Sequence, residues 1–281
     1  MTKKGNSYKA VKLGQGVYGQ VVLMQSQSDG SLMAVKKLTN VQHPDRVTEA
    51  FSRETQAMNA VSSNQAFPDF LGTVDRYSFA MQFLGSQDKR SAWSAYEMSN
   101  KWIKRMTSTD WLKVSLDVTK GLKAMHEAGW THNDLHNDNV MVCQDPETKA
   151  WKGKIIDLGF AHRLDNPPPP RCMTPKQKRH CYKHCAQLAP EIIEGSSQYN
   201  TKSDVYSLGQ LFLDIAPQSR KLAGLKSLGK KCTKILPSNR PSLDQVLQEL
   251  TRVYTVRANK PRKPGLLKTM YRSLKTRFRR R

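Results

Sequence analysis

The chain has 281 residues, 46 of them Lys or Arg and 23 Asp or Glu, and its formal net charge is +23. This length allows one large domain or two small ones with a sizeable core. The composition excludes collagen-like, coiled-coil and disulfide-scaffold proteins. No apolar run approaches the roughly 18 residues needed to cross a bilayer. The start of the chain does not resemble a secretory signal. Together with five Cys residues, an odd number, this predicts an intracellular protein with reduced thiols, in the nucleus or the cytoplasm.

The positive charge is concentrated in a C-terminal segment, because residues 257–281 hold eleven Lys or Arg and no acidic residue. Such a segment predicts contact with nucleic acid, acidic protein or an anionic lipid surface. Its apolar residues recur at helical spacing, as in a basic amphipathic helix. The alternative is that these apolar residues dock on the rest of the protein while the charges stay solvated.

In chain order, the first elements are strands and the later ones are mostly helices. Apolar and polar residues alternate around glycines in 8–38, which predicts β-hairpins, and 45–61 has helical spacing. Helical periods dominate from about residue 108 onward. Further short strands are expected at 66–84 (two strands broken near Asp75-Arg76), 140–143 and 154–157. A small β-rich part followed by a larger α-rich part predicts two lobes joined near residues 82–85.

A glycine-rich motif, G-x-G-x-x-G-x-V, lies at residues 14–21. Glycines let a backbone turn approach phosphate oxygens with its amide N–H groups. A strand-like run follows the last glycine, whereas a dinucleotide-binding motif requires a helix there. A plain glycine-rich hairpin remains the alternative interpretation.

A lysine follows an apolar strand in Ala34-Val35-Lys36. A cation in that position needs anionic partners, and phosphate oxygens and a helix carboxylate would supply them. Glu54 on the following predicted helix is the preferred candidate, with Glu49 as the alternative.

Two acidic motifs follow, His132-Asn133-Asp134-Leu135-His136-Asn137-Asp138-Asn139 and Asp157-Leu158-Gly159. They supply one base and two oxygen ligands. Hard oxygen ligands suit Mg²⁺, which keeps several waters and binds phosphates beside one or two carboxylates.

Together these motifs resemble the protein kinase family, in a divergent, serine/threonine-like form. The resemblance covers about residues 8–250 and continues in Ala189-Pro190-Glu191, in Ser203-Asp204 and in Arg240-Pro241. It implies an α+β, bilobal fold with an N-lobe at 1–82, a C-lobe at 83–252 and a basic tail at 253–281. The compact catalytic part and basic tail also resemble virus-encoded kinases.

The resemblance implies an ATP-dependent protein kinase that uses Mg²⁺ and a protein substrate, acidic or associated with nucleic acid. Asp134 would accept the substrate proton, Lys36 paired with Glu54 would bind phosphates, and Asn139 and Asp157 would hold Mg²⁺. Asp204 would hold the catalytic loop, and Glu191 would pair with Arg240. The residues implied to surround ATP are Gly14, Gln15, Gly16, Val17, Gly19, Val21, Ala34, Lys36, Met81, Gln82 and Leu84.

The position of the hinge between the lobes has two interpretations. In the preferred one, residues 79–85 form the last N-lobe strand and enter the hinge, with Met81 as gatekeeper and the backbone of 82–84 meeting adenine. The competing one places the hinge at Ala95-Tyr96-Glu97-Met98. The first leaves 91–107 for a helix.

The sequence departs from the family pattern near the catalytic aspartate. Asn133 replaces the arginine that pairs with an activation-loop phosphate, so we hypothesise that activity does not require phosphorylation of 160–188. His136 stands where serine/threonine kinases place a lysine that contacts the transferred phosphate. His184 stands where they place a threonine, and Leu158 replaces the Phe of D-F-G.

The activation segment, residues 160–188, contains a proline run at 167–170 and three of the five Cys residues. Its His180-Cys181 and His184-Cys185 pairs suggest a zinc clip, and a basic loop with reduced thiols that faces the substrate is the alternative. For the whole chain, two other functions stay open. These are a kinase-fold scaffold that binds anionic partners and a small-molecule phosphotransferase.

Overall fold

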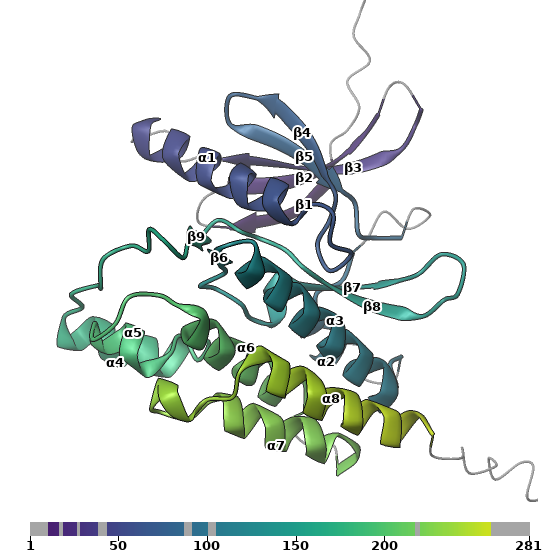
Figure 1. Ribbon diagram of the computed structural model, residues 1–281. Coiled ribbons are helices and arrows are strands. Elements are labelled where there is room, and N and C mark those ends of the chain that lie inside the picture. Colours follow the sequence, from purple (N-terminus) through teal and green to yellow (C-terminus); the bar gives the residue numbers. More distant parts are fainter. Residues whose placement is uncertain are drawn as a thin grey trace, which may run out of the picture.

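The computed structural model describes residues 11–16, 19–26, 29–38, 44–86, 92–100, 105–216 and 220–259. Figure 1 shows an upper part, built from a sheet and one long helix, above a lower part made mainly of helices. This arrangement confirms the predicted α+β, bilobal fold. Among the described residues, no helix has the length and apolar character needed to span a membrane.

The upper sheet has five antiparallel strands in the order β1-β2-β3-β5-β4. The strands form where the sequence alternates apolar and polar residues, and the turn between β4 and β5 follows the predicted break. There the Asp75 side chain accepts a hydrogen bond from the Tyr77 amide at 2.9 Å. The strand bounds are β1 Val11–Gly16, β2 Gly19–Gln25, β3 Leu32–Leu38, β4 Phe70–Asp75 and β5 Ser78–Gln82.

The long helix α1, Pro44–Val61, lies against this sheet (Figure 1). Phe51, Glu54, Met58 and Val61 recur at intervals of three or four residues and therefore share one face of the helix. The Phe51 ring lies 6.1 Å from the Phe79 ring of β5. The apolar face of α1 thus fixes the helix on the sheet and carries Glu54 inward with it.

The lower part packs around α3, Ser108–Glu127, whose apolar residues are buried along most of its length. Its first turn is closed by a capping box between Thr107 and Asp110, which satisfies amide groups that the helix leaves unpaired. The other helices of at least ten residues are α4 Pro175–His184, α6 Thr201–Ile215, α7 Ala223–Cys232 and α8 Leu243–Ala258. The shorter ones are α2 Ala95–Asn100, α5 Pro190–Glu194, η1 Asn137–Asn139, η2 Arg220–Leu222 and η3 Pro237–Asn239.

Two small antiparallel pairs lie between the sheet and the helices, namely β6 Trp130–Thr131 with β9 His162–Arg163, and β7 Val140–Gln144 with β8 Trp151–Ile155. The strand predicted at 154–157 therefore begins and ends earlier than expected. Asp157 has a φ of 60°, in the left-handed region, and a strand cannot continue through that conformation.

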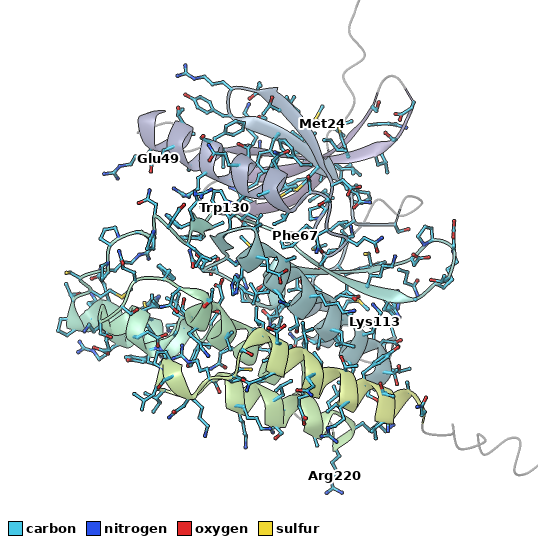
Figure 2. The ribbon with its side chains drawn as sticks, in the orientation of Figure 1. Met24, Glu49, Phe67, Lys113, Trp130 and Arg220 are labelled. Atoms are coloured by element: carbon cyan, nitrogen blue, oxygen red, sulfur yellow. The ribbon has the colours of Figure 1, made fainter. Side chains whose placement is uncertain are left out.

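One hydrophobic core runs through both parts of the molecule. Phe67 is fully buried in it, and Figure 2 shows this residue between the sheet and the helices below. The segment around Phe67 is also tied to β8. The Ile155 amide donates to the Ala66 carbonyl at 2.7 Å, and Lys154 Nζ donates to the Phe67 carbonyl at 2.8 Å and to Gln82 Oε1 at 2.9 Å. These bonds join the two parts directly.

The activation segment is more ordered than a loop. The proline run at 167–170 has no regular structure, as expected, but 175–184 forms α4. Thr174 and Gln177 form a capping box, and Pro175 lies in the first turn of the helix. An N–H group has no intrahelical acceptor in that turn, so proline is tolerated there. The Thr-Pro-x-Gln sequence was the signal for this helix.

The C-terminal helix α8 runs through the predicted boundary at residue 252 and ends at Ala258. Val253 and Tyr254 pack against the core, so the start of the predicted tail belongs to a packed helix. Most of the basic segment, from residue 260 onward, lies outside the described residues, and so does its predicted amphipathic helix.

Candidate functional site

The residues expected around a nucleotide gather on one face of the upper sheet. Gly14 of β1 pairs with Val21 of β2, and Val21 pairs with Lys36 of β3. Ala34, two residues before Lys36 on β3, pairs with Met81 of β5. Side chains two residues apart on a strand point to the same side of a sheet. Val21, Ala34, Lys36 and Met81 therefore share one face.

The glycine motif forms the hairpin between β1 and β2. Gly14, Gln15 and Gly16 end β1, and Gly19 opens β2 opposite Gly16. A Cβ atom on Gly19 would lie 2.2 Å from the Lys37 carbonyl oxygen, so this position accepts only glycine. Val17 lies outside the described residues.

Lys36 is buried between two carboxylates that come from different elements. Its Nζ lies 2.7 Å from Glu54 Oε1 on α1 and 2.8 Å from Asp157 Oδ1 after β8. Lys36 and Glu54 are only 7% and 2% exposed, whereas the Glu49 side chain is 79% exposed. Glu54, not Glu49, is thus the helix partner of the lysine.

Electrostatics in this cluster favours the charged forms of Lys36 and Asp157. Burial by itself would lower the pKa of Lys36, but the two carboxylates outweigh it and raise the pKa well above its ordinary value. Burial likewise opposes ionisation of Asp157, yet the Lys36 ammonium group lowers the pKa of that carboxyl. The cluster therefore holds a cation next to an ionised aspartate at neutral pH.

The loop after β6 is held by a fully buried carboxylate on α6. Asp204 accepts hydrogen bonds at 2.8 Å from the backbone amides of His132 and Asn133, and its Oδ2 lies 2.9 Å from His126 Nε2. Burial opposes the charge on Asp204, but His126 and these donors outweigh it and lower the pKa of the carboxyl. Three contacts on one buried anion fix the shape of the loop.

His132 fixes the same loop from inside. It is completely buried, and burial lowers its pKa, so the imidazole is neutral. Its Nδ1 accepts from the Asp134 amide at 3.2 Å, and its Nε2 lies 3.3 Å from the Ile156 carbonyl oxygen. The loop that carries Asp134 is thereby tied to the segment that carries Asp157.

Asp134 projects from this loop with three polar neighbours. Asn139 Nδ2 donates to the Asp134 carbonyl at 2.9 Å and to Oδ2 at 3.4 Å, and His136 Nε2 lies 3.6 Å from Oδ2. The third neighbour is Gln187, whose Nε2 donates to Oδ1 at 3.1 Å. Gln187 is not part of any motif in the sequence. His184, which stands where the family resemblance implies a threonine, lies three residues before it.

Gln187 is itself held in place by α6, because the Ser207 hydroxyl donates to its carbonyl oxygen at 2.7 Å. Gln187 lies two residues before Ala189 and three after the end of α4. Nothing in the local sequence identifies Gln187 as a site residue, since a glutamine in a loop is usually solvated. Only the folding of the activation segment over the catalytic loop brings it to Asp134.

The oxygen ligands available for a metal ion are Asn139 and Asp157. Asn139 uses its amide nitrogen on Asp134, which leaves its amide oxygen for another partner, and the Asp157 side chain is 44% exposed. An amide oxygen, a carboxylate and a nearby ammonium group fit Mg²⁺ that is shared with phosphates.

The segment proposed as the hinge follows β5 directly. Gln82 ends the strand, and its side chain accepts from Lys154 at 2.9 Å. Leu84 lies two residues further, outside regular structure. The competing hinge at residues 95–98 falls inside the helix α2, where Ala95 and Met98 are buried, rather than in an extended segment that leaves β5.

Asn133 contacts the activation segment through neutral hydrogen bonds. Its Nδ2 donates to the Phe160 carbonyl at 2.9 Å and lies 3.4 Å from His162 Nδ1. Arg53 on α1 reaches the same segment, because its Nη2 donates to the Gly159 carbonyl at 3.0 Å. The start of the activation segment is thus anchored without a phosphate group.

The end of the activation segment is anchored by a buried ion pair. Arg240 donates to both oxygens of Glu191, at 2.6 and 2.7 Å, and its side chain is fully buried. Its guanidinium also donates to three backbone carbonyls and lies 4.9 Å from the Tyr206 ring centre. This bidentate pair joins α5 to the loop before α8.

The Cys and His residues of the activation segment do not form a metal centre. The His180 and His184 rings lie 4.8 Å apart, and Cys181 Sγ lies 3.8 Å from Met173 Sδ. Across the part of the chain that the structure describes, no group of three or more His, Cys, Asp or Glu side chains is placed to hold a metal ion. The zinc interpretation therefore gains no support.

Comparison with known proteins identifies the family of this chain. The protein kinase domain model matches residues 8–234, so the chain belongs to the protein kinase family. Proteins of this family transfer phosphate from ATP, generally with Mg²⁺.

Curated relatives are similar at low identity. The membrane-associated tyrosine- and threonine-specific cdc2-inhibitory kinase of Drosophila melanogaster is 24% identical over 83% of this chain and 37% of its own length. The serine/threonine-protein kinase MAK of Mus musculus is 26% identical, over 75% of this chain and 31% of its own length. The sporulation protein kinase mde3 of Schizosaccharomyces pombe is 26% identical, over 73% of this chain and 36% of its own length. The chain thus spans well under half the length of these relatives.

We expect Gln187→Ala to lower kcat about tenfold. A hydrogen bond to a charged group contributes about 1.5–3 kcal/mol, and its loss frees Asp134 to leave the productive orientation. KM for ATP should stay unchanged, because Gln187 is remote from the sheet face. Gln187→Glu should lower kcat further, through repulsion of Asp134. The measurement is steady-state phosphate transfer, with the exposed Gln56→Ala as control; equal kcat in Gln187→Ala and wild type would contradict the assignment.

Proposed function

We propose that this chain is an ATP-dependent protein kinase that transfers the γ-phosphate to protein hydroxyl groups, chiefly of Ser and Thr. The single observation that carries the proposal is the meeting of Lys36, Glu54 and Asp157 beside the loop of Asp134. Those groups come from four separate stretches of the chain. A scaffold that only binds partners has no need to bury a cation at such a meeting point.

The residues take the following roles. Lys36, fixed by Glu54, binds the phosphates of ATP under the glycine hairpin, and Asp134 accepts the proton of the substrate hydroxyl. Asp134 suits this task because Gln187 and Asn139 orient its carboxylate. Adenine lies against Ala34 and Met81 and meets the backbone of 82–84.

Asn139 and Asp157 would hold Mg²⁺, which neutralises charge on the transferred phosphate when it is bound. Asp157 contacts Lys36 in this structure, and its lowered pKa keeps it ionised and ready to bind a cation. Positioning and charge neutralisation, rather than covalent chemistry, are what these residues contribute.

The test is phosphate transfer from labelled ATP and Mg²⁺ to casein, a histone and a Glu-Tyr polymer. Asp134→Asn and Asp157→Asn should each lower the rate by about 10²–10⁴-fold, because each removes a carboxylate that the reaction requires. The exposed Asp244→Asn serves as the matched control and should keep full activity. Phosphoamino-acid analysis of the products assigns the hydroxyl type.

Three results would contradict the proposal. No transfer and no thermal shift with Mg-ATP would support a basic scaffold. A thermal shift without protein phosphorylation would point to a small-molecule acceptor. Full activity in Asp134→Asn, with an unchanged melting temperature, would remove Asp134 as the base.

His136 provides a second, pH-dependent part of the proposal. Burial alone would lower its pKa, but Asp134 and Asp138 outweigh it and raise the pKa above the ordinary histidine value. Asp157 acts in the same direction. Only the protonated imidazole is a cation, so we infer that His136 contacts the transferred phosphate in its protonated form.

We expect the wild-type rate to fall as pH rises through the pKa of His136, because the cation is lost there. His136→Lys should keep its rate to about pH 9, since the unperturbed pKa of lysine is about 10.4. The measurement is kcat/KM for the protein substrate between pH 6 and 9. The exposed His184→Lys is the control and should retain the fall; a fall that is identical in His136→Lys would exclude this role.

Asn133 supports the hypothesis that the enzyme is active without a phosphorylated activation segment. Its amide holds the Phe160 carbonyl and carries no charge that would call for a phosphate. Phosphatase-treated protein should therefore retain more than about half of its kcat, a loss smaller than about 0.4 kcal/mol in barrier height. Mass spectrometry of residues 160–188 must show the segment unmodified. Activity that is lost on treatment and restored by rephosphorylation would exclude the hypothesis.

A further inference from the structure

The activation-segment helix α4 has two opposite faces of different character. Lys178, Cys181, Tyr182 and Cys185 recur at helical spacing and turn toward α5 and the segment before α4. Lys178 Nζ lies 2.6 Å from Glu194 Oε2, and the Tyr182 hydroxyl donates to Glu194 Oε1 at 2.8 Å. These contacts fix α4 beside α5, as Figure 1 also shows.

The opposite face of α4 is a basic stripe made of Lys176, Arg179, His180 and Lys183. Their positions follow the i, i+3, i+4, i+7 spacing of one helix face, and all four are exposed. Helix α4 contains no acidic residue. Within the described part of the chain, Lys176, Arg179 and Lys183 form no ion pair, whereas Lys178 on the docked face does.

The stripe lies close to the base of the proposed reaction. Helix α4 ends at His184, and three residues later Gln187 donates to Asp134. At 1.5 Å per residue, the stripe from Lys176 to Lys183 is about 10 Å long. An extended peptide advances about 3.3 Å per residue, so the stripe spans about three peptide residues.

We propose that the basic stripe of α4 binds an acidic stretch of the substrate, about three residues long, next to the phosphorylated hydroxyl. The inference rests on the proposed kinase function and assigns its substrate class. Charge complementarity selects this occupant. Lys176, Arg179 and Lys183 lie in a row on a docked helix and face solvent, and among the described residues no carboxylate pairs with them. Ion pairs between the stripe and an acidic stretch would chiefly speed the capture of the substrate and discriminate against basic sequences.

The test uses Ser peptides that carry Glu-Glu-Glu or Gln-Gln-Gln on either side of the Ser. The triple variant Lys176→Glu, Arg179→Glu, Lys183→Glu reverses the charge of the stripe. A second triple variant, with Gln at the same three positions, removes the charge without reversing it. The matched control is Lys221→Glu, Lys230→Glu, Lys231→Glu. These three lysines are exposed at η2 and at the end of α7. Both Glu triple variants change the net charge by the same amount.

We expect the wild type to prefer one of the Glu peptides by at least about fivefold in kcat/KM, chiefly through KM. Exposed ion pairs contribute about 0.2–1 kcal/mol each, and three pairs account for this factor. The stripe variants should lose the preference and the control should keep it. Raising the salt from 50 to 300 mM should weaken it, because the pairs are exposed. Unchanged melting temperatures show that the variants fold.

Wild-type phosphorylation without a charge preference, or an equal loss in the control, would overturn this inference and leave the kinase function intact. If no peptide is phosphorylated at all, the kinase proposal fails, and binding of a fluorescent Glu peptide without ATP still tests the stripe. Equal binding to wild type and stripe variants would then overturn it. A single-stranded oligonucleotide that requires the stripe, while the Glu peptide does not, would assign the stripe to nucleic acid instead.

Discussion

The structure depends on one buried cation. Lys36 cannot be buried in an apolar interior without anionic partners, because the desolvation of an unpaired ammonium group costs several kcal/mol. Glu54 from α1 and Asp157 from the segment after β8 supply those partners at 2.7 and 2.8 Å. The position of α1 on the sheet and the position of the lower part beneath it are therefore coupled through a single Nζ atom. Removing either carboxylate leaves the other to balance the lysine alone.

A second buried charge holds the loop that carries Asp134. Asp204 is completely buried, and its two oxygens together accept from two consecutive backbone amides and face His126. The amides of a loop have no regular partners of their own, so a fixed carboxylate determines the loop's shape. The Glu191–Arg240 pair secures the end of the activation segment in a similar manner. The site is thus built on three buried charges that are each paired.

The sequence predicted the site residues that belong to short motifs of recognisable spacing. It did not reveal contacts between segments that are distant in the chain. Lys36, Asp134, Asn139 and Asp157 could be named because each stands in a short motif with a recognisable order. Glu54 could be named as a carboxylate on the helix predicted to follow Lys36. Gln187 could not be named, since its contact with Asp134 depends on how the whole activation segment folds back. Helix α4 was predictable from its cap but was overlooked, because the adjacent prolines and the Cys-His pairs suggested a loop.

The distribution of charge explains why a chain of net charge +23 still contains an acidic site. Asp134, Asp138 and Asp157 all raise the pKa of His136, and within the described residues these carboxylates pair with Lys36 and His136. Under the proposed function, Asn139 and Asp157 would hold a divalent cation here, and that cation would meet the phosphates of a nucleotide. The excess positive charge lies outside the cluster, where it would attract an anionic partner without pairing with these carboxylates. Separating the two signs of charge would let one surface collect the acidic substrates that we propose, while the carboxylates of the site stay clear of the excess cations.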